Sequence, residues 1–170
     1  CKLLYVSVSK QFAAATIRAN QESFHQKIEA LQLPADADEE LVFSHFWLKS
    51  YFYHACENFE RCSEVLRMAI RHMKQFTSDK SRLRTFQMDL KLAEMLYYTS
   101  QFEASFRSYK KNAASALNHR IPDFSYHLTK YLQICLITSH LDEAQAIVQN
   151  RLLQKGKVAP QALLPRDIIS

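Results

Sequence analysis

The sequence predicts an all-α protein, a solenoid of antiparallel helical hairpins with about 7–8 helices. Three observations support this prediction. The 170 residues include one glycine and four prolines, whereas folds rich in strands need glycine at turns and bulges. Apolar residues recur at helical spacing through most of the chain. A short pattern also returns at an interval of roughly 40 residues, which is the length of one hairpin in a helical-repeat protein.

The recurring pattern consists of an apolar residue at the start of a helical run and a small residue three positions later. It occurs at 58–62, 101–105 and 140–144, where the small residues are Cys62, Ser105 and Ala144. Stacked hairpins of this kind present an extended surface to a partner and do not converge on one reaction centre. The pattern therefore predicts a binding module.

The first predicted hairpin spans about 1–33. Residues 2–9 have the pattern of the end of a helix, and a second helix is predicted over 11–31. Leu33 precedes Pro34, and proline disfavours helix in the residue before it, which ends this helix.

The second predicted hairpin spans 39–76. Asp38 is a helix-start signal for a helix that runs to about 55, and a partner helix covers 59–76. The predicted inward residues at helical spacing are Val42, Phe43, Phe46, Ser50, Tyr53, Cys62, Leu66, Ala69 and Met73.

Two more hairpins follow, at about 80–118 and 123–155. The first comprises helices at about 81–99 and 102–118, and Ser100 with Glu103 fits a capping box between them. The second comprises helices at 123–138 and 141–155. Together the four hairpins form one predicted domain, 1–156, and residues 157–170 are a tail or the start of a further repeat.

The formal charge of the chain is +5, and much of the positive charge lies in residues 61–84. A solvated helix face with its loop is one interpretation of this segment, and a patch that binds phosphate or another acidic group is the other. The segment lacks interleaved base-stacking aromatics and any known nucleic-acid motif. Nucleic-acid binding is therefore an unlikely role, kept as the weaker alternative.

Neither the cysteines nor the other polar residues predict a metal site or a catalytic site. Cys1, Cys56, Cys62 and Cys135 form no CxxC pair and have no histidine at zinc-finger spacing, so neither a metal nor a cofactor is expected. No nucleophile–base pair is evident, and one glycine cannot form a glycine-rich phosphate loop. We therefore expect a protein that is not an enzyme. Buried free thiols, the absence of an 18-residue apolar run and the lack of an export signal predict a cytoplasmic protein without a membrane span.

The hairpins resemble tetratricopeptide repeats (TPR), in a variant with long helices, over residues 1–155. That family alternates large and small residues at fixed places in its two helices. The matching positions of the first complete repeat are Phe46, Ser50, Tyr53, Cys62, Leu66 and Ala69; those of the second are Asp89, Ala93, Leu96, Ser105, Tyr109 and Asn112; those of the third are Leu128, Leu132, Cys135, Ala144, Val148 and Arg151. Asp89, Leu132 and Arg151 depart from the family pattern. The resemblance implies a right-handed α-solenoid that binds proteins or peptides.

In that family, ligands lie on the concave face formed by the first helix of each hairpin. Carried over residue by residue, the resemblance implies a partner-binding face formed by Ser44, Trp47, Tyr51, His54, Gln87, Leu90, Glu94, Tyr97, Tyr98, Tyr126, Thr129 and Gln133. Aromatic side chains on such a face would anchor a peptide. The alternative is that these aromatics pack against neighbouring hairpins or a flanking domain.

The predicted function is that of a peptide-binding module in a larger signalling or transcription-regulating protein. A structural scaffold that self-assembles through its end hairpins is the alternative, and a homo-oligomer or a flanking output domain would fit either.

Overall fold

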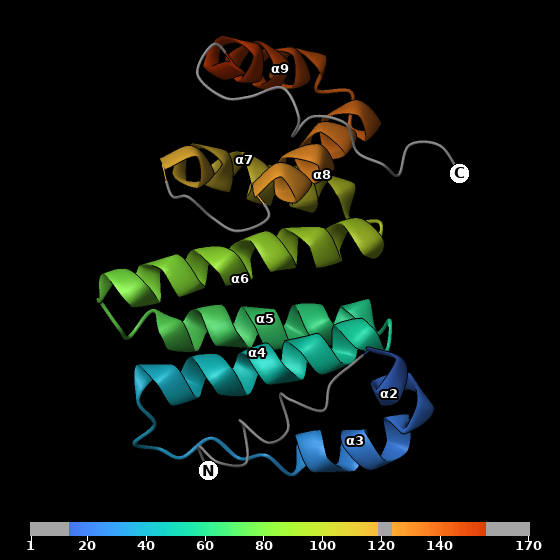
Figure 1. The fold of residues 1–170 in the computed structure, drawn as a ribbon, viewed down its shortest axis with the longest axis vertical. Helices are drawn as coiled ribbons and strands as arrows, with labels where there is room; N and C mark the ends of the chain where they lie inside the picture. Colours follow the sequence, from blue (N-terminus) through green and yellow to red (C-terminus); the bar gives the residue numbers. More distant parts are fainter. Residues whose placement is uncertain (1–13, 119–123, 156–170) are drawn as a thin grey trace. The chain divides into compact units, whose positions relative to one another are not determined.

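The structure is a computed structural model that describes residues 14–118 and 124–155. Within these ranges the chain forms eight α-helices and no strand, as the all-α prediction requires (Figure 1). No helix in the described ranges is long and apolar enough to cross a membrane. The chain divides into two compact units, residues 1–112 and 113–170, and each unit is described by itself.

The observed helices follow the predicted boundaries closely from residue 39 onward. The helices are α2 (Ala14–Ala19), α3 (Gln21–Glu29), α4 (Glu39–Ala55), α5 (Phe59–Met73), α6 (Asp79–Tyr98), α7 (Phe102–Asn118), α8 (Phe124–Ile137) and α9 (Leu141–Lys155). The predicted helix at 2–9 and the predicted tail at 157–170 lie outside the described residues.

The single helix predicted over 11–31 is wrong, because the chain forms α2 and α3 with a break at Asn20. The backbone of Asn20 is non-helical, with φ −129° and ψ 32°, and its side-chain amide donates to the carbonyl of Thr16 at 3.2 Å. Asparagine competes with helix by bonding locally to the backbone. The apolar spacing alone could not show this break.

Three helices in the first unit begin with a side-chain cap. The carboxylate of Asp38 accepts from the amide of Leu41 at 2.8 Å. Asn58 and Ser78 accept in the same way from the amides three residues later, at 3.1 Å and 2.9 Å. Each cap satisfies a backbone donor that the helix itself leaves without a partner.

The three hairpins from residue 39 onward have the same turn. Glu57, Ser100 and Ser139 each have a left-handed backbone, with φ near 58°. At each turn the amide of the left-handed residue donates to the carbonyl three residues earlier, and the next amide donates to the carbonyl five residues earlier. This is the Schellman arrangement, which closes the end of a helix. The second helix begins two residues after the left-handed one, so one turn of three residues separates the two helices each time.

This turn corrects the capping box predicted at Ser100 and Glu103. Ser100 is the left-handed residue of the turn, and the carbonyl of Gln101 accepts the first helical bond from the amide of Ser105 at 2.9 Å. Gln101 is therefore the N-cap of α7. Ser100 lies one position too early for that role, because the same short turn must also end α6.

Small residues lie where the two helices of a hairpin come together. The thiol of Cys62 on α5 donates to the carbonyl of Ser50 on α4 at 3.2 Å. At the matching place in the next hairpin, the hydroxyl of Ser105 donates to the carbonyl of Ala93 at 2.7 Å. All four residues are buried. A larger side chain at either position would keep the helices too far apart for these bonds.

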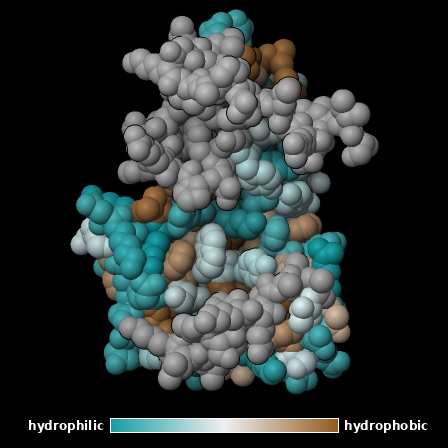
Figure 2. Space-filling model, in the orientation of Figure 1, coloured by the Kyte–Doolittle hydropathy of each residue, from teal (hydrophilic) through white to brown (hydrophobic). Residues whose placement is uncertain are grey.

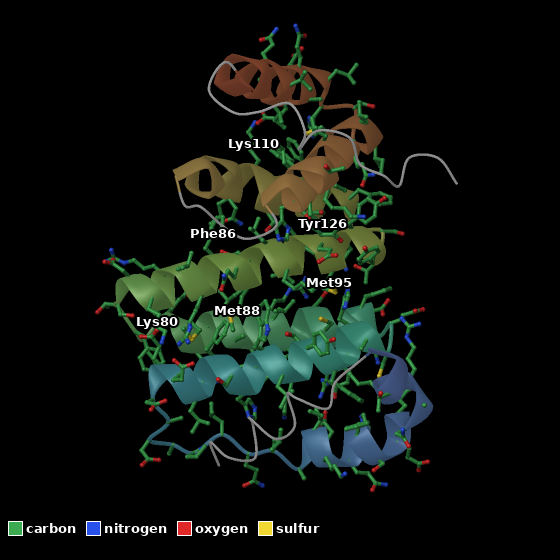
Figure 3. The ribbon with its side chains drawn as sticks, in the orientation of Figure 1. Lys80, Phe86, Met88, Met95, Lys110 and Tyr126 are labelled. Atoms are coloured by element: carbon green, nitrogen blue, oxygen red, sulfur yellow. The ribbon has the colours of Figure 1, made fainter. Side chains whose placement is uncertain are left out.

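The core of the first unit lies between α4, α5 and α6. Leu66, Met73, Met88 and Met95 are fully buried in one cluster. Met88 and Met95 extend from α6 toward α5 (Figure 3). All the inward residues predicted for the hairpin at 39–76 are buried except Phe43, which is half-buried.

The second unit contains the hairpin of α8 and α9. Tyr131, Ile134 and Cys135 on α8 are buried, and the hydroxyl of Tyr131 donates to Glu143 on α9 at 2.8 Å. Four large apolar side chains of this hairpin are exposed: Leu136, Ile137, Leu141 and Val148.

Candidate partner-binding site

An aromatic strip runs along α4 and across the start of α5 to the end of α6. We use this name for Phe43, Trp47, Tyr51, His54, Phe59 and Tyr98. Along α4, the rings of Phe43 and Trp47 stack with centroids 5.4 Å apart. Further on, the ring of Phe59 lies 6.0 Å from that of His54 and stacks on that of Tyr98 at 4.7 Å. The strip therefore joins three helices of the first unit.

The strip combines ring packing with exposure. Trp47 is 37% exposed, Tyr51 is 40% exposed and Tyr98 is 37% exposed. Trp47 packs on Phe43 and Tyr98 packs on Phe59, yet both rings and that of Tyr51 remain partly exposed. Aromatic side chains of this kind bury large areas on binding and lose little conformational entropy.

One end of the strip is fixed by a charged cluster that joins the N-terminal ends of α4 and α6. The guanidinium of Arg84 lies 4.4 Å from the centroid of the Phe43 ring and donates to both carboxylate oxygens of Glu40 at 2.7 Å. Lys80 donates to Glu40 at 2.7 Å, and Ser78 donates to Glu39 at 2.6 Å. Figure 2 shows hydrophilic side chains gathered at this end of the unit, on the left of the view.

The cluster stabilises the charged form of Glu40. The hydrogen bonds from Arg84 and then from Lys80 hold the pKa of Glu40 below its ordinary value. Arg84 itself is only 8% exposed. One guanidinium nitrogen of Arg84 donates to both oxygens of Glu40 and another lies 3.5 Å from Glu39. These charge-assisted bonds hold the guanidinium over the Phe43 ring.

The other end of the strip contains His54. Burial lowers the pKa of His54, and the charge of Lys91 lowers it further, while Glu94 acts in the opposite direction. His54 is therefore neutral at pH 7, and the strip has no ionised group at this end.

Two of the residues predicted for the partner-binding face are buried. Leu90 is 2% exposed and Glu94 is 3% exposed. The carboxylate of Glu94 pairs with Lys91 at 2.8 Å, so its charge is compensated inside the protein. The resemblance implied that both residues lie on the same face as Trp47 and Tyr51, but at these two positions α6 is buried.

The other predicted residues are accessible to different degrees. Tyr126 and Gln133 on α8 are exposed, and Tyr126 is labelled in Figure 3. Both belong to the second unit. The half-buried residues are Ser44, His54, Gln87, Tyr97 and Thr129.

The sequence prediction omitted two members of the strip, Phe43 and Phe59. Phe43 was assigned to the core, and Phe59 begins the second helix of its hairpin, whereas the family rule considers only first helices. The signal was present, because Phe59 directly follows the tight turn after His54 and Tyr98 precedes the equivalent turn.

The basic segment 61–84 is largely neutralised by neighbouring carboxylates. Arg61 pairs with Glu64 at 2.6 Å, and Arg82 pairs with Asp79 at 3.4 Å. Lys80 and Arg84 pair with Glu40. The exposed cations that form no such pair within the described residues are Arg67, Arg71 and Lys74.

The described residues contain no group of three or more histidine, cysteine or acidic side chains placed to hold a metal ion. Comparison of the chain with family models, with curated proteins and with solved structures gives no match.

Proposed function

We propose that this chain is a non-catalytic helical-repeat module, TPR-like in its hairpins, that binds a segment of a partner protein through the aromatic strip. The observation that carries the proposal is the exposure of Trp47 and Tyr51 on one face of α4, continued by Tyr98 on α6. Three identical turns at intervals of about 40 residues support the repeat architecture. Such a module would act as the sensory part of a larger cytoplasmic regulatory protein.

The bound segment would lay apolar side chains against the rings. Trp47 and Tyr51 lie four residues apart, and residues at this spacing share one side of a helix. A helix or extended peptide with apolar residues at regular spacing would match them. The end of the strip at Arg84 and Lys80 adds cations, although Glu40 already pairs with both.

The test is a selection of peptides from a displayed random library against the whole chain. Selected peptides should bind Trp47→Ala and Tyr51→Ala at least about 10-fold more weakly, as expected for hot-spot aromatics. Met68→Ala is the matched control, because Met68 is 47% exposed but lies on α5 away from the strip. Circular dichroism and urea unfolding would show that each variant is folded.

Peptides that bind Trp47→Ala and the unmodified chain equally would contradict the proposal. Unfolding of both variants would contradict it as well, because the aromatic rings would then belong to the core.

A self-assembling scaffold is the second candidate. The exposed Leu136, Leu141 and Val148 on the hairpin of α8 and α9 favour it, because apolar residues gathered in this way often mark an interface. Light scattering over a range of concentrations would test it. A mass that rises with concentration, and that Leu141→Lys returns to the monomer value, would support self-assembly.

A further inference from the structure

A second concave feature lies in the first unit, apart from the aromatic strip. It is a pocket of about 620 Å³ between the segment 31–37, which links α3 to α4, and the adjacent faces of α4 and α5. No residue of the aromatic strip lines it. Its volume is within the range of about 300–1,000 Å³ that is typical of small-molecule sites.

The walls of the pocket contain both apolar and polar side chains. Val42 and Val65 are buried within it, and Met68 is half exposed at its rim. Three of its lining rings form a row, in which Phe46 lies 5.1 Å from His45 on one side and 5.1 Å from His72 on the other. Phe46 and His45 are buried, so His72 is the ring of this row that a ligand can contact. Together with Met68 it suits a flat or branched apolar group.

The charged groups that line the pocket are Glu29, Lys49 and Arg61. Glu29 accepts a hydrogen bond from the hydroxyl of Tyr53, and this bond lowers the pKa of Glu29 more than the charges of Lys49 and Arg61 do. Arg61 pairs with Glu64. Lys49 forms no ion pair with any of the described residues. The pocket therefore holds a cation whose charge is not neutralised by direct contact.

The lowered pKa of His45 is consistent with the same positive environment. Burial lowers its pKa to about 4, and the charges of Lys49 and His72 contribute in the same direction. The imidazole is therefore neutral at pH 7 and can donate or accept a hydrogen bond. An anion bound near Lys49 would offset this positive potential.

We propose that this pocket binds a small organic carboxylate with an apolar or aromatic body. The carboxylate pairs with Lys49, and the body lies against the exposed side chains of Met68 and His72. A carboxylate is favoured over a cation because Glu29 is already occupied by Tyr53. A carboxylate is also favoured over a neutral ligand, because its negative charge compensates the positive charge of Lys49 in a partly enclosed site.

The test uses 4-phenylbutyrate as the probe and 4-phenylbutanamide as its neutral counterpart, with the whole chain. Titration is followed by the NMR signal of the Met68 methyl group and by calorimetry. A ligand of this size should bind with a Kd of about 1 mM. The amide should bind about 10-fold more weakly, because it cannot form the charged pair.

Two variants locate the site. Lys49→Met keeps the length of the side chain and removes the charge. It should therefore weaken the binding of 4-phenylbutyrate about 10-fold and leave the binding of the amide unchanged. Lys74→Met removes the same charge from an exposed position that does not line the pocket, and it should have no effect. Met68→Glu places a carboxylate at the exposed rim of the pocket. Its negative charge should repel 4-phenylbutyrate and weaken the binding of this acid in a second, independent way.

Three results would overturn the proposal: no saturable shift of the Met68 signal, equal binding of acid and amide, or equal effects of Lys49→Met and Lys74→Met. The two proposals fail separately, because Trp47→Ala should leave the binding of 4-phenylbutyrate intact and Lys49→Met should leave the binding of selected peptides intact.

Discussion

The first helices of two consecutive hairpins, α4 and α6, end in the same turn and contact their second helices in the same way, but they bury different faces. Ser50 and Ala93 each lie seven residues before the left-handed residue of their turn, and both carbonyls accept a bond from the second helix. Three residues before Ser50, Trp47 is exposed, whereas Leu90, three residues before Ala93, is buried.

The different exposure of Trp47 and Leu90 separates the features that a hairpin determines by itself from those that depend on its surroundings. The turn and the contact between the two helices of a hairpin depend on residues within that hairpin, so they recur. The exposure of the remaining faces depends on what packs against each helix from outside. Trp47 is therefore available to a partner, and Leu90 is not, although both residues lie at the same position relative to the turn of their hairpin.

The largest effect on stability is expected when an apolar side chain of a second helix is replaced by alanine, and it should differ between two hairpins. Leu66 and Val148 each lie nine residues after the left-handed residue of their turn, but Leu66 is fully buried and Val148 is 45% exposed. Leu66→Ala should lower the free energy of unfolding by about 3 kcal/mol through the cavity that it creates. Val148→Ala should change it by less than about 0.5 kcal/mol. Urea unfolding measures both, and similar losses would mean that the two positions are equally packed.

The boundaries of the helices from residue 39 to 155 could be predicted because they depend on local signals. Asp38, Asn58 and Ser78 are capping residues, and the small residues at Cys62 and Ser105 mark the close approach of two helices. These signals lie within a few residues of the feature that they determine.

The candidate site could be predicted only in part, because exposure depends on distant residues. Glu94 is charged, and charged residues are rarely buried unless they are paired. Its partner Lys91 lies three residues away, but the sequence does not show that both turn toward the interior. The pocket near Lys49 was not predicted for the same reason, since the segment 31–37, α4 and α5 must meet to form it.

The next effect concerns the charged cluster that joins α4 to α6. Arg84→Met should destabilise the protein by about 2 kcal/mol, less than the loss of a fully buried ion pair, because the Glu40 side chain is 49% exposed. The effect should also depend on pH. The pKa of Glu40 is lowered in the folded state, so its contribution is present at neutral pH and is lost as the pH falls through that lowered pKa.

Urea unfolding at neutral and acidic pH would test this prediction. The difference between Arg84→Met and the unmodified chain should shrink as Glu40 becomes protonated. Arg82→Met is the control, because Arg82 is exposed and pairs only with Asp79 at 3.4 Å. A loss that does not change with pH would show that Arg84 acts by packing against Phe43 and not through its charge.

A smaller effect of opposite sign is expected at the shared turn. Ser100 has φ 58°, a conformation that costs an L-residue roughly 1–2 kcal/mol and that glycine adopts freely. Ser100→Gly should raise the free energy of unfolding by about 0.5 kcal/mol, after the greater entropy of glycine in the unfolded chain is allowed for. Ser100→Ala keeps the Cβ atom and should give no gain. A gain in thermal midpoint for alanine as large as that for glycine would contradict this explanation.

At neutral pH the smallest effect is expected from exchanging the two donors that hold the hairpins together. Cys62→Ser and Ser105→Cys should each change the free energy of unfolding by less than about 0.5 kcal/mol, because thiol and hydroxyl already occupy equivalent positions in the two hairpins. The sharper difference lies at high pH. Burial raises the pKa of Cys62 from about 9 to about 12, so the folded state keeps a proton that the unfolded state loses.

The stability that this thiol contributes is therefore complete below pH 9 and falls as the pH rises toward 12, by up to about 1.4 kcal/mol per pH unit. Cys62→Ser lacks this loss, so its stability relative to the unmodified chain should rise through that range, measured by urea unfolding at several pH values. If the relative stability stays constant, burial does not raise the pKa of this thiol, and solvent reaches the contact between α4 and α5 at Cys62.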